Sequence, residues 1–107
     1  MSGTISLSPD VDWSATYWLF DWVLKDIAKA TDDVELAGHL NGIVGEHLGW
    51  FGLADISPNQ RREVRRIVTE RLVDDAQREF PTSMPELPQA LAFLRELVAN
   101  FADVADG

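Results

Sequence analysis

The sequence predicts an all-α fold, either a compact four-helix bundle or an orthogonal helical array. Apolar residues recur at spacings of three and four in four segments, which is the period of a helix with one buried face. No stretch alternates apolar and polar residues convincingly enough to predict a strand. The predicted helices cover residues about 12–30, 33–50, 58–79 and 87–104. They form a single domain of 107 residues, whose ends at residues 1–8 and 105–107 are expected to fray.

The first predicted helix, residues 12–30, has two aromatic faces. Residues 8–10 read Ser-Pro-Asp, which offers an N-cap, a proline at N1 and an acidic first turn, so the helix could begin there. Trp18 and Trp22 lie opposite the main apolar seam at about 100° per residue. They either fit between two neighbouring helices or form an exposed patch of the kind that binds proteins. The seam is spaced four, three, four and three: Trp13, Tyr17, Phe20, Leu24 and Ile27.

The second predicted helix, residues 33–50, carries a stripe of glycines opposite its leucine face. Asp32 is the expected N-cap, with Glu35 as its capping-box partner. Each glycine inside a helix costs about 0.5–1 kcal/mol relative to alanine, so close packing is expected to offset the cost. We expect the aromatic first helix to pack on the stripe; a ligand groove, an intermolecular contact and a break near residues 42–45 are the alternatives. The stripe is Gly38, Gly42, Gly45, Gly49 and Gly52.

The third and fourth predicted helices have clear starts. Ser57 is the expected N-cap of the third, with Pro58 at N1 and Gln60 completing a capping box. The fourth follows a loop stiffened by prolines. Four arginines near the start of the third helix oppose its dipole: Arg61, Arg62, Arg65 and Arg66. We expect them to pair with the acidic first half of this chain or to be solvated; an anion site is the alternative.

The composition excludes several classes of protein. The chain has no cysteine, so disulfides, thiolate zinc sites and thiol nucleophiles are excluded. Its first ten residues lack the basic and apolar regions of a signal peptide. No apolar run approaches the roughly 18–20 residues that a membrane span requires. We therefore expect a cytoplasmic protein with no membrane partner.

No motif indicates catalysis, a cofactor or a metal site. The glycines follow a helical period and lack the Gly-Lys-Ser/Thr ending of a phosphate loop, and no nucleophile elbow is present. Glu35 and His39 stand four residues apart, but Glu46 is about 10 Å further along the helix axis. Adjacent acids at positions 32–33 and 74–75 point about 100° apart and do not converge. We expect a chain that is not an enzyme and binds neither cofactor nor metal.

The charge suggests the kind of partner. Eighteen acidic residues against nine basic ones give a net charge of −9. Residues 1–56 carry nine acids and two bases, whereas residues 57–80 carry five acids and six arginines. Such a charge repels duplex nucleic acid and attracts a basic protein, although it also simply favours solubility.

These traits resemble those of small acidic inhibitors, such as bacterial immunity proteins and antitoxins, at the level of class. The sequence favours a non-enzymatic interaction module that neutralises a basic protein partner such as a toxin or nuclease. The alternatives are a helical binder of a small hydrophobic ligand or cofactor, and a self-associating subunit such as a homodimer. The expected contact residues are Trp18, Trp22, Asp21, Asp26 and Asp33, the tryptophans burying on contact and the carboxylates steering the partner.

Overall fold

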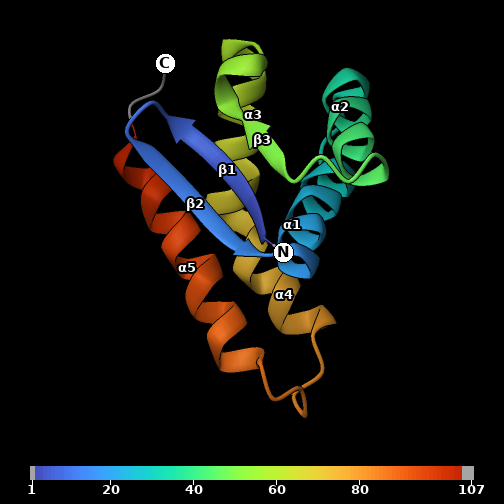
Figure 1. The fold of residues 1–107 in the computed structure, drawn as a ribbon, viewed down its shortest axis with the longest axis vertical. Helices are drawn as coiled ribbons and strands as arrows, with labels where there is room; N and C mark the ends of the chain where they lie inside the picture. The colour runs from blue at the N-terminus through green and yellow to red at the C-terminus, as the bar shows by residue number, and fades with distance from the viewer. Residues whose placement is uncertain (1, 105–107) are drawn as a thin grey trace.

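Residues 2–104 are described by the computed structural model of the chain, which combines a three-stranded sheet with helices (Figure 1). The prediction of an all-α fold is therefore wrong. The strands are Ser2–Ser8 (β1), Val11–Thr16 (β2) and Trp50–Gly52 (β3). The α-helices are Tyr17–Ala30 (α1), Val34–Gly45 (α2), Pro58–Ile67 (α3), Val73–Glu79 (α4) and Leu87–Asp103 (α5). Leu53–Asp55 is a 3-10 turn, and Val68–Leu72 is a π-helical segment between α3 and α4.

The sheet is built on the segment that the sequence analysis expected to fray. β1 is the central strand, antiparallel to β2 and parallel to β3, in the order β2-β1-β3. The prediction of a frayed end is therefore wrong for Ser2–Ser8. Pro9 and Asp10, interpreted as a possible helix start, instead form the turn that joins β1 to β2. The fixed φ of proline suits the second position of a turn as well as the first turn of a helix. The aspartate side chain can accept a backbone hydrogen bond in either structure.

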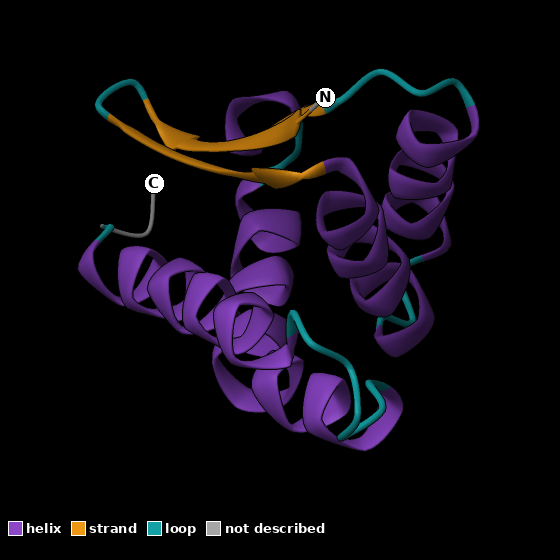
Figure 2. Ribbon diagram, turned by 60° about the horizontal axis from the view of Figure 1, so that its bottom comes forward, coloured by secondary structure: helices purple, strands orange, loops and turns teal. Residues whose placement is uncertain are grey.

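Alternate residues of each strand point toward the helices, which gather on one side of the sheet (Figure 2). Ile5 on β1 lies opposite Trp13 on β2 and Phe51 on β3, and all three side chains are at most 2% exposed. The other face of the β1–β2 hairpin carries hydroxyl groups, among which those of Thr4 and Ser14 lie 2.9 Å apart. The apolar side of the sheet is therefore part of the core, and its outer side is polar.

The first helix begins later than predicted. α1 starts at Tyr17, and the residues immediately before it belong to β2. Trp13 therefore reaches the core from the sheet, where its Nε1–H donates to the carbonyl of Phe93 on α5 over 2.8 Å. The rest of the predicted seam is helical, and Phe20, Leu24 and Ile27 are fully buried.

The second helix is shorter than predicted. α2 ends at Gly45, and His47 just beyond it has a positive φ of 54°. The predicted last turn of this helix is instead a loop and the short strand β3. Asp33, rather than Asp32, is the N-cap.

The glycine stripe on α2 is open. A Cβ placed on Gly38, Gly42 or Gly45 would meet nothing within 4 Å. The prediction that the first helix packs on this stripe is therefore wrong for these three residues. α1 packs instead on the opposite side of α2, where Leu36, Leu40 and Ile43 are buried.

Residues 58–79 form one helix over the predicted range, made of α3, the π segment and α4. The capping box is confirmed: the Gln60 N–H donates to Ser57 Oγ over 3.2 Å, and the Ser57 N–H donates to Gln60 Oε1 over 3.0 Å. At the start of the π segment the Thr69 hydroxyl donates to the Arg65 carbonyl over 2.8 Å. This hydroxyl competes with backbone N–H groups for the Arg65 carbonyl. The competition favours the wider turn of the π segment.

α5 runs close to the fourth predicted range and covers β2. The predicted fraying of residues 105–107 lies outside the described residues. Within residues 2–104, no helix combines the length and the apolar composition needed to cross a membrane.

Candidate functional site

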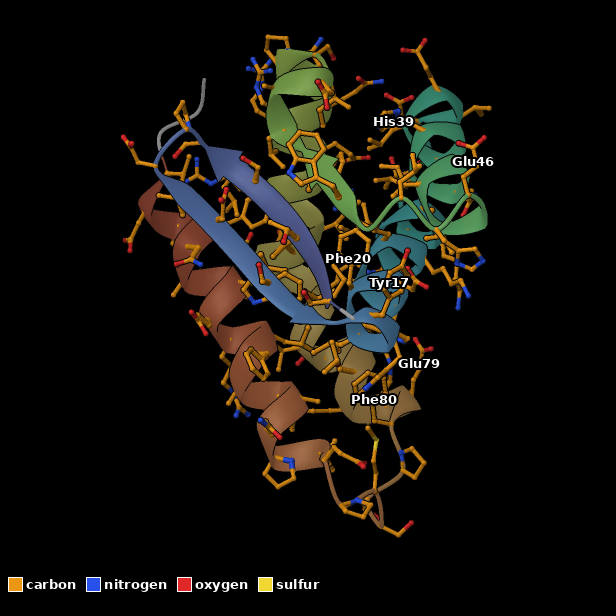
Figure 3. The ribbon with its side chains drawn as sticks, viewed as in Figure 1. Tyr17, Phe20, His39, Glu46, Glu79 and Phe80 are labelled. Atoms are coloured by element: carbon orange, nitrogen blue, oxygen red, sulfur yellow. The ribbon has the colours of Figure 1, made fainter. Side chains whose placement is uncertain are left out.

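Trp18 and Trp22, the predicted partner-binding tryptophans, lie over the end of α4. Both rings meet Phe80 edge-on, with centroids 5.7 and 4.8 Å from its ring. The Trp22 Nε1–H donates to Glu79 Oε1 over 3.4 Å, and Figure 3 shows Glu79 and Phe80 together at this end of the helix. Trp18 is 44% exposed, whereas Trp22 is half-buried. Trp18 is thus the accessible member of the pair.

The three predicted carboxylates lie in different surroundings. Asp33 caps α2, since its Oδ1 accepts from the Leu36 N–H over 2.9 Å. Asp21 is partly buried, and its Oδ1 meets no donor among the described residues. Asp26 is only 5% exposed. The structure therefore brings the two tryptophans together but does not gather the three carboxylates beside them on one exposed surface.

Asp26 on α1 and Asp75 on α4 form a buried carboxyl pair. Burial raises the pKa of Asp26 to about 7, and the hydrogen bond and negative charge of Asp75 add to the effect. Asp75 is held by Arg78 and by Arg71, whose Nε lies 3.8 Å from its Oδ2. A proton on Asp26 lets the two carboxyls share a buried site without mutual repulsion. This pair joins two helices, a role that the sequence analysis did not foresee for Asp26.

The residues considered for a metal ion have other neighbours. Glu35 Oε1 accepts from Gln60 Nε2 over 3.4 Å, and the His39 ring lies 5.9 Å from the ring of Phe51. Glu46 lies further along α2 (Figure 3). Across the part of the chain that the structure describes, no three His, Cys, Asp or Glu side chains are grouped so that they could hold a metal ion.

The most exposed large apolar side chains of the described chain lie on α2 and the loop after it. Val34 is 85% exposed and Leu48 is 58% exposed. The open glycines occupy the outward face between them, and two glutamates flank that face. We call this set the α2 surface: Val34, Glu35, Gly38, Gly42, Gly45, Glu46 and Leu48.

The α2 surface lies in the most acidic stretch of the chain. Residues 31–55 carry five acids and neither lysine nor arginine. Four of these acids are exposed: Asp32, Glu35, Glu46 and Asp55. Figure 1 shows α2 at one side of the molecule, beside α1 and away from α5. The regular spacing of the glycines predicts a covered face, so the spacing alone does not reveal this surface; the lack of any base near them is the signal that could.

A pocket of about 390 Å³ lies at the end of the sheet near the β1–β2 turn. It is bounded by the end of β1, by β3 and the 3-10 turn, by the first turns of α3 and by the end of α5. Its apolar wall includes Leu7, Trp50, Leu53 and Phe101. Two arginines also line it, Arg61 and Arg65.

Two of the α3 arginines, Arg62 and Arg66, are exposed and have partners on their own helix. Arg66 pairs with acids of its own helix, Glu63 at 2.8 Å and Glu70 at 3.8 Å. Arg62 donates to Asn59, one turn earlier. Arg61 is directed to backbone carbonyls at the pocket, as described below.

Comparisons of this chain with protein-family models, with curated proteins and with solved structures gave no match. Its candidate surfaces are therefore interpreted from geometry and chemistry alone.

Proposed function

We propose that this chain is a non-enzymatic interaction module that binds a basic protein through the α2 surface, as an inhibitor of the immunity or antitoxin type would. One observation carries the proposal. The α2 surface places two of the most exposed apolar side chains, Val34 and Leu48, within the stretch of the chain that has five acids and no base.

The charge of this stretch supports a basic partner. A cluster of one sign focuses the field of a protein with a net charge of −9 and speeds the capture of an oppositely charged surface. Glu35 and Glu46 stand at the two ends of α2 and are both exposed. They are placed to pair with lysines or arginines at the rim of a contact.

The shape of α2 supports a close contact. Three glycines in a helix cost the fold about 1.5–3 kcal/mol relative to alanine, and nothing in the described chain lies within 4 Å of a Cβ placed on Gly38, Gly42 or Gly45. A partner backbone can approach this smooth face more closely than a face with side chains. The face extends about 16 Å from Val34 to Gly45 at the rise of a helix, with apolar side chains at both ends to bury on contact.

The same charges disfavour self-association through α2. A two-fold antiparallel pairing of two copies would bring Glu35 of one copy beside Glu46 of the other, because both residues lie on the same side of the glycine stripe. Like charges that face each other are destabilising. We therefore place a different, basic chain on this surface. Trp18 and Trp22 remain a second predicted contact region, which a Trp18→Ala variant examines in the binding measurement with the partner.

A photo-crosslinking amino acid in place of Gly42 tests the proposal in cells. The open space at position 42 accepts a large side chain without a clash. The matched control carries the same amino acid at Ala99, which is exposed on α5. We expect a basic protein to be cross-linked from position 42 and not from position 99, and mass spectrometry identifies it. Equal products from both positions, or a cross-link of the chain only to itself, would contradict the proposal.

The identified partner is then used in a binding measurement. Gly42→Arg places a long cation on the α2 surface, where no neighbour lies within 4 Å, so the fold should persist. We expect at least a tenfold loss of affinity, with an unchanged helical circular-dichroism signal. Ala99→Arg supplies the same charge change elsewhere and should keep nearly full affinity. Trp18→Ala, measured in parallel, shows whether the predicted tryptophan region also contributes.

A further inference from the structure

The pocket beside the β1–β2 turn is separate from the α2 surface, and the proposed function does not involve it. Its volume of about 390 Å³ is within the range of small-molecule sites, about 300–1,000 Å³. It lies between three elements that are distant in the sequence, β1, α3 and α5. Such a position gives rigid walls, because each element is fixed by its own part of the core.

One wall is a tryptophan ring that only a glycine can accommodate. Trp50 and Gly52 stand on the same side of β3, and a Cβ at position 52 would overlap the ring of Trp50. The absence of that atom lets the indole lie over the strand, where it lines the pocket. Phe101 of α5 lines it as well. Two aromatic side chains with Leu7 and Leu53 suit the apolar body of a ligand.

A partly buried arginine in the same wall has no carboxylate partner among residues 2–104. One terminal nitrogen of Arg61, Nη1, donates to the carbonyls of Ile56 (2.8 Å) and Leu53 (3.3 Å), which fixes the guanidinium in place. Its Nε is buried and meets no acceptor within the described residues. A buried donor without an acceptor lowers the stability of the folded state. Arg61 Nε is such a donor although acids outnumber bases two to one in this chain. The same side chain lines the pocket, so the wall of the pocket carries a fixed positive charge.

We propose that this pocket binds a small amphipathic carboxylate, with its apolar body beside Trp50 and Phe101 and its carboxylate beside the guanidinium of Arg61. A planar guanidinium edge matches the two oxygens of a carboxylate. Arg65 lines the same pocket and adds positive charge to it. The net charge of −9 repels an anion in proportion to its charge, which favours a singly charged head over a phosphate ester. The site is independent of the α2 surface.

An NMR titration of the whole chain with octanoate tests the proposal. The probes are the indole N–H of Trp50, assigned with Trp50→Phe, and the Nε–H of Arg61. We expect both signals to shift in a saturable way at millimolar octanoate. Octan-1-ol, which lacks the charge, and sodium acetate, which lacks the apolar body, should each bind at least tenfold more weakly.

Three variants separate the pocket from general effects of charge and folding. Arg61→Gln should weaken octanoate binding at least tenfold, whereas Arg62→Gln, one residue along the same helix, should leave it unchanged. Ala54→Phe fills the pocket from its exposed rim, and should abolish binding while the remaining amide spectrum is preserved. Absence of a saturable shift, equal binding of octan-1-ol, equal binding of acetate, or unchanged binding by Ala54→Phe would each overturn the proposal.

Discussion

α2 and the long helix over residues 58–79 are built in contrasting ways. The long helix begins with a full capping box and a proline at N1, and its inner face is nearly free of solvent. α2 has one capping side chain, Asp33, and three exposed glycines on its outer face. The long helix contacts α1 and α5, whereas α2 rests mainly on α1. The long helix is therefore a main part of the packed core, whereas α2 is weakly stabilised and accessible. Recognition elements are often of the second kind.

The same substitution in the two regions should have very different effects. Leu72 in the long helix is fully buried, so Leu72→Ala should lower the free energy of unfolding by about 2–5 kcal/mol through lost burial and a cavity. Leu48 after α2 is 58% exposed, so Leu48→Ala should change it by no more than about 0.5 kcal/mol. Urea unfolding followed by circular dichroism measures both. Similar losses for the two variants would remove the contrast.

The contact of the long helix with α1 should depend on pH. The folded state raises the pKa of Asp26 from 3.8 to about 7, so it holds this proton more tightly than the unfolded chain does. The contribution of Asp26 to the free energy of unfolding is therefore highest at and below about pH 4, and it falls as the pH rises to about 7. The ionised form costs the folded state on the order of 4 kcal/mol, since the pKa rises by about three units and each unit corresponds to about 1.4 kcal/mol.

Asp26→Asn tests this pH dependence, because the amide cannot ionise. We expect the variant to be more stable than the wild type at about pH 8 and to lose the fall in stability between about pH 4 and 7. Urea unfolding at a series of pH values gives the comparison. Asp21→Asn, on the same helix, is the control and should keep the wild-type pH profile. A wild-type profile for Asp26→Asn would show that the buried pair does not titrate in this range.

The caps of the two helices should report on different extents of unfolding. Ser57→Ala removes half of the capping box of the long helix and should lower the global free energy of unfolding by about 1 kcal/mol. Asp33→Ala removes the single cap of α2 and should act mainly on local opening. Amide hydrogen exchange distinguishes them: the first should speed exchange throughout the core, the second mainly within α2. Equal effects on both helices would mean that they unfold together.

Alanine in place of a glycine should have opposite signs at two positions. Gly42→Ala meets nothing within 4 Å and should raise the free energy of unfolding by about 0.5–1 kcal/mol. Gly52→Ala must displace the ring of Trp50 and should lower it. Thermal unfolding of the two variants gives the sign of each change. A loss of stability at position 42 would indicate that the α2 surface is covered.

The helical part of the fold could be predicted from periodicity, but the sheet could not, because two patterns coincide. The hairpin does alternate: Ile5 faces the core between Thr4 and Ser6, and Trp13 faces it between Asp12 and Ser14. Yet Trp13 also stands four residues before Tyr17, so it extends the helical seam of α1 without a break. A strand that runs directly into a helix hides its own period. The Pro9 turn was equally compatible with a helix start.

The candidate sites depended on which faces other elements cover, and that is a tertiary property. The inner face of α2 was evident from Leu36, Leu40 and Ile43, but the sequence does not say that its glycine face has no neighbour. Likewise, the burial of Asp26 beside Asp75 depends on how α1 and α4 pack together. The unpaired Nε of Arg61 depends on the carbonyls that hold the rest of its guanidinium, which no spacing of arginines reveals.

The hydrogen bond from Trp13 to Phe93 has a consequence for how the chain acquires its structure during synthesis. It joins residues 80 positions apart, between the second strand and the last described helix. Translation delivers the hairpin before the acceptor for its indole and before the helix that covers β2. Contacts of such long range form late and slow folding. A ribosome-bound chain that stops before α5 should thus expose an apolar sheet face, a stage at which chaperones would act.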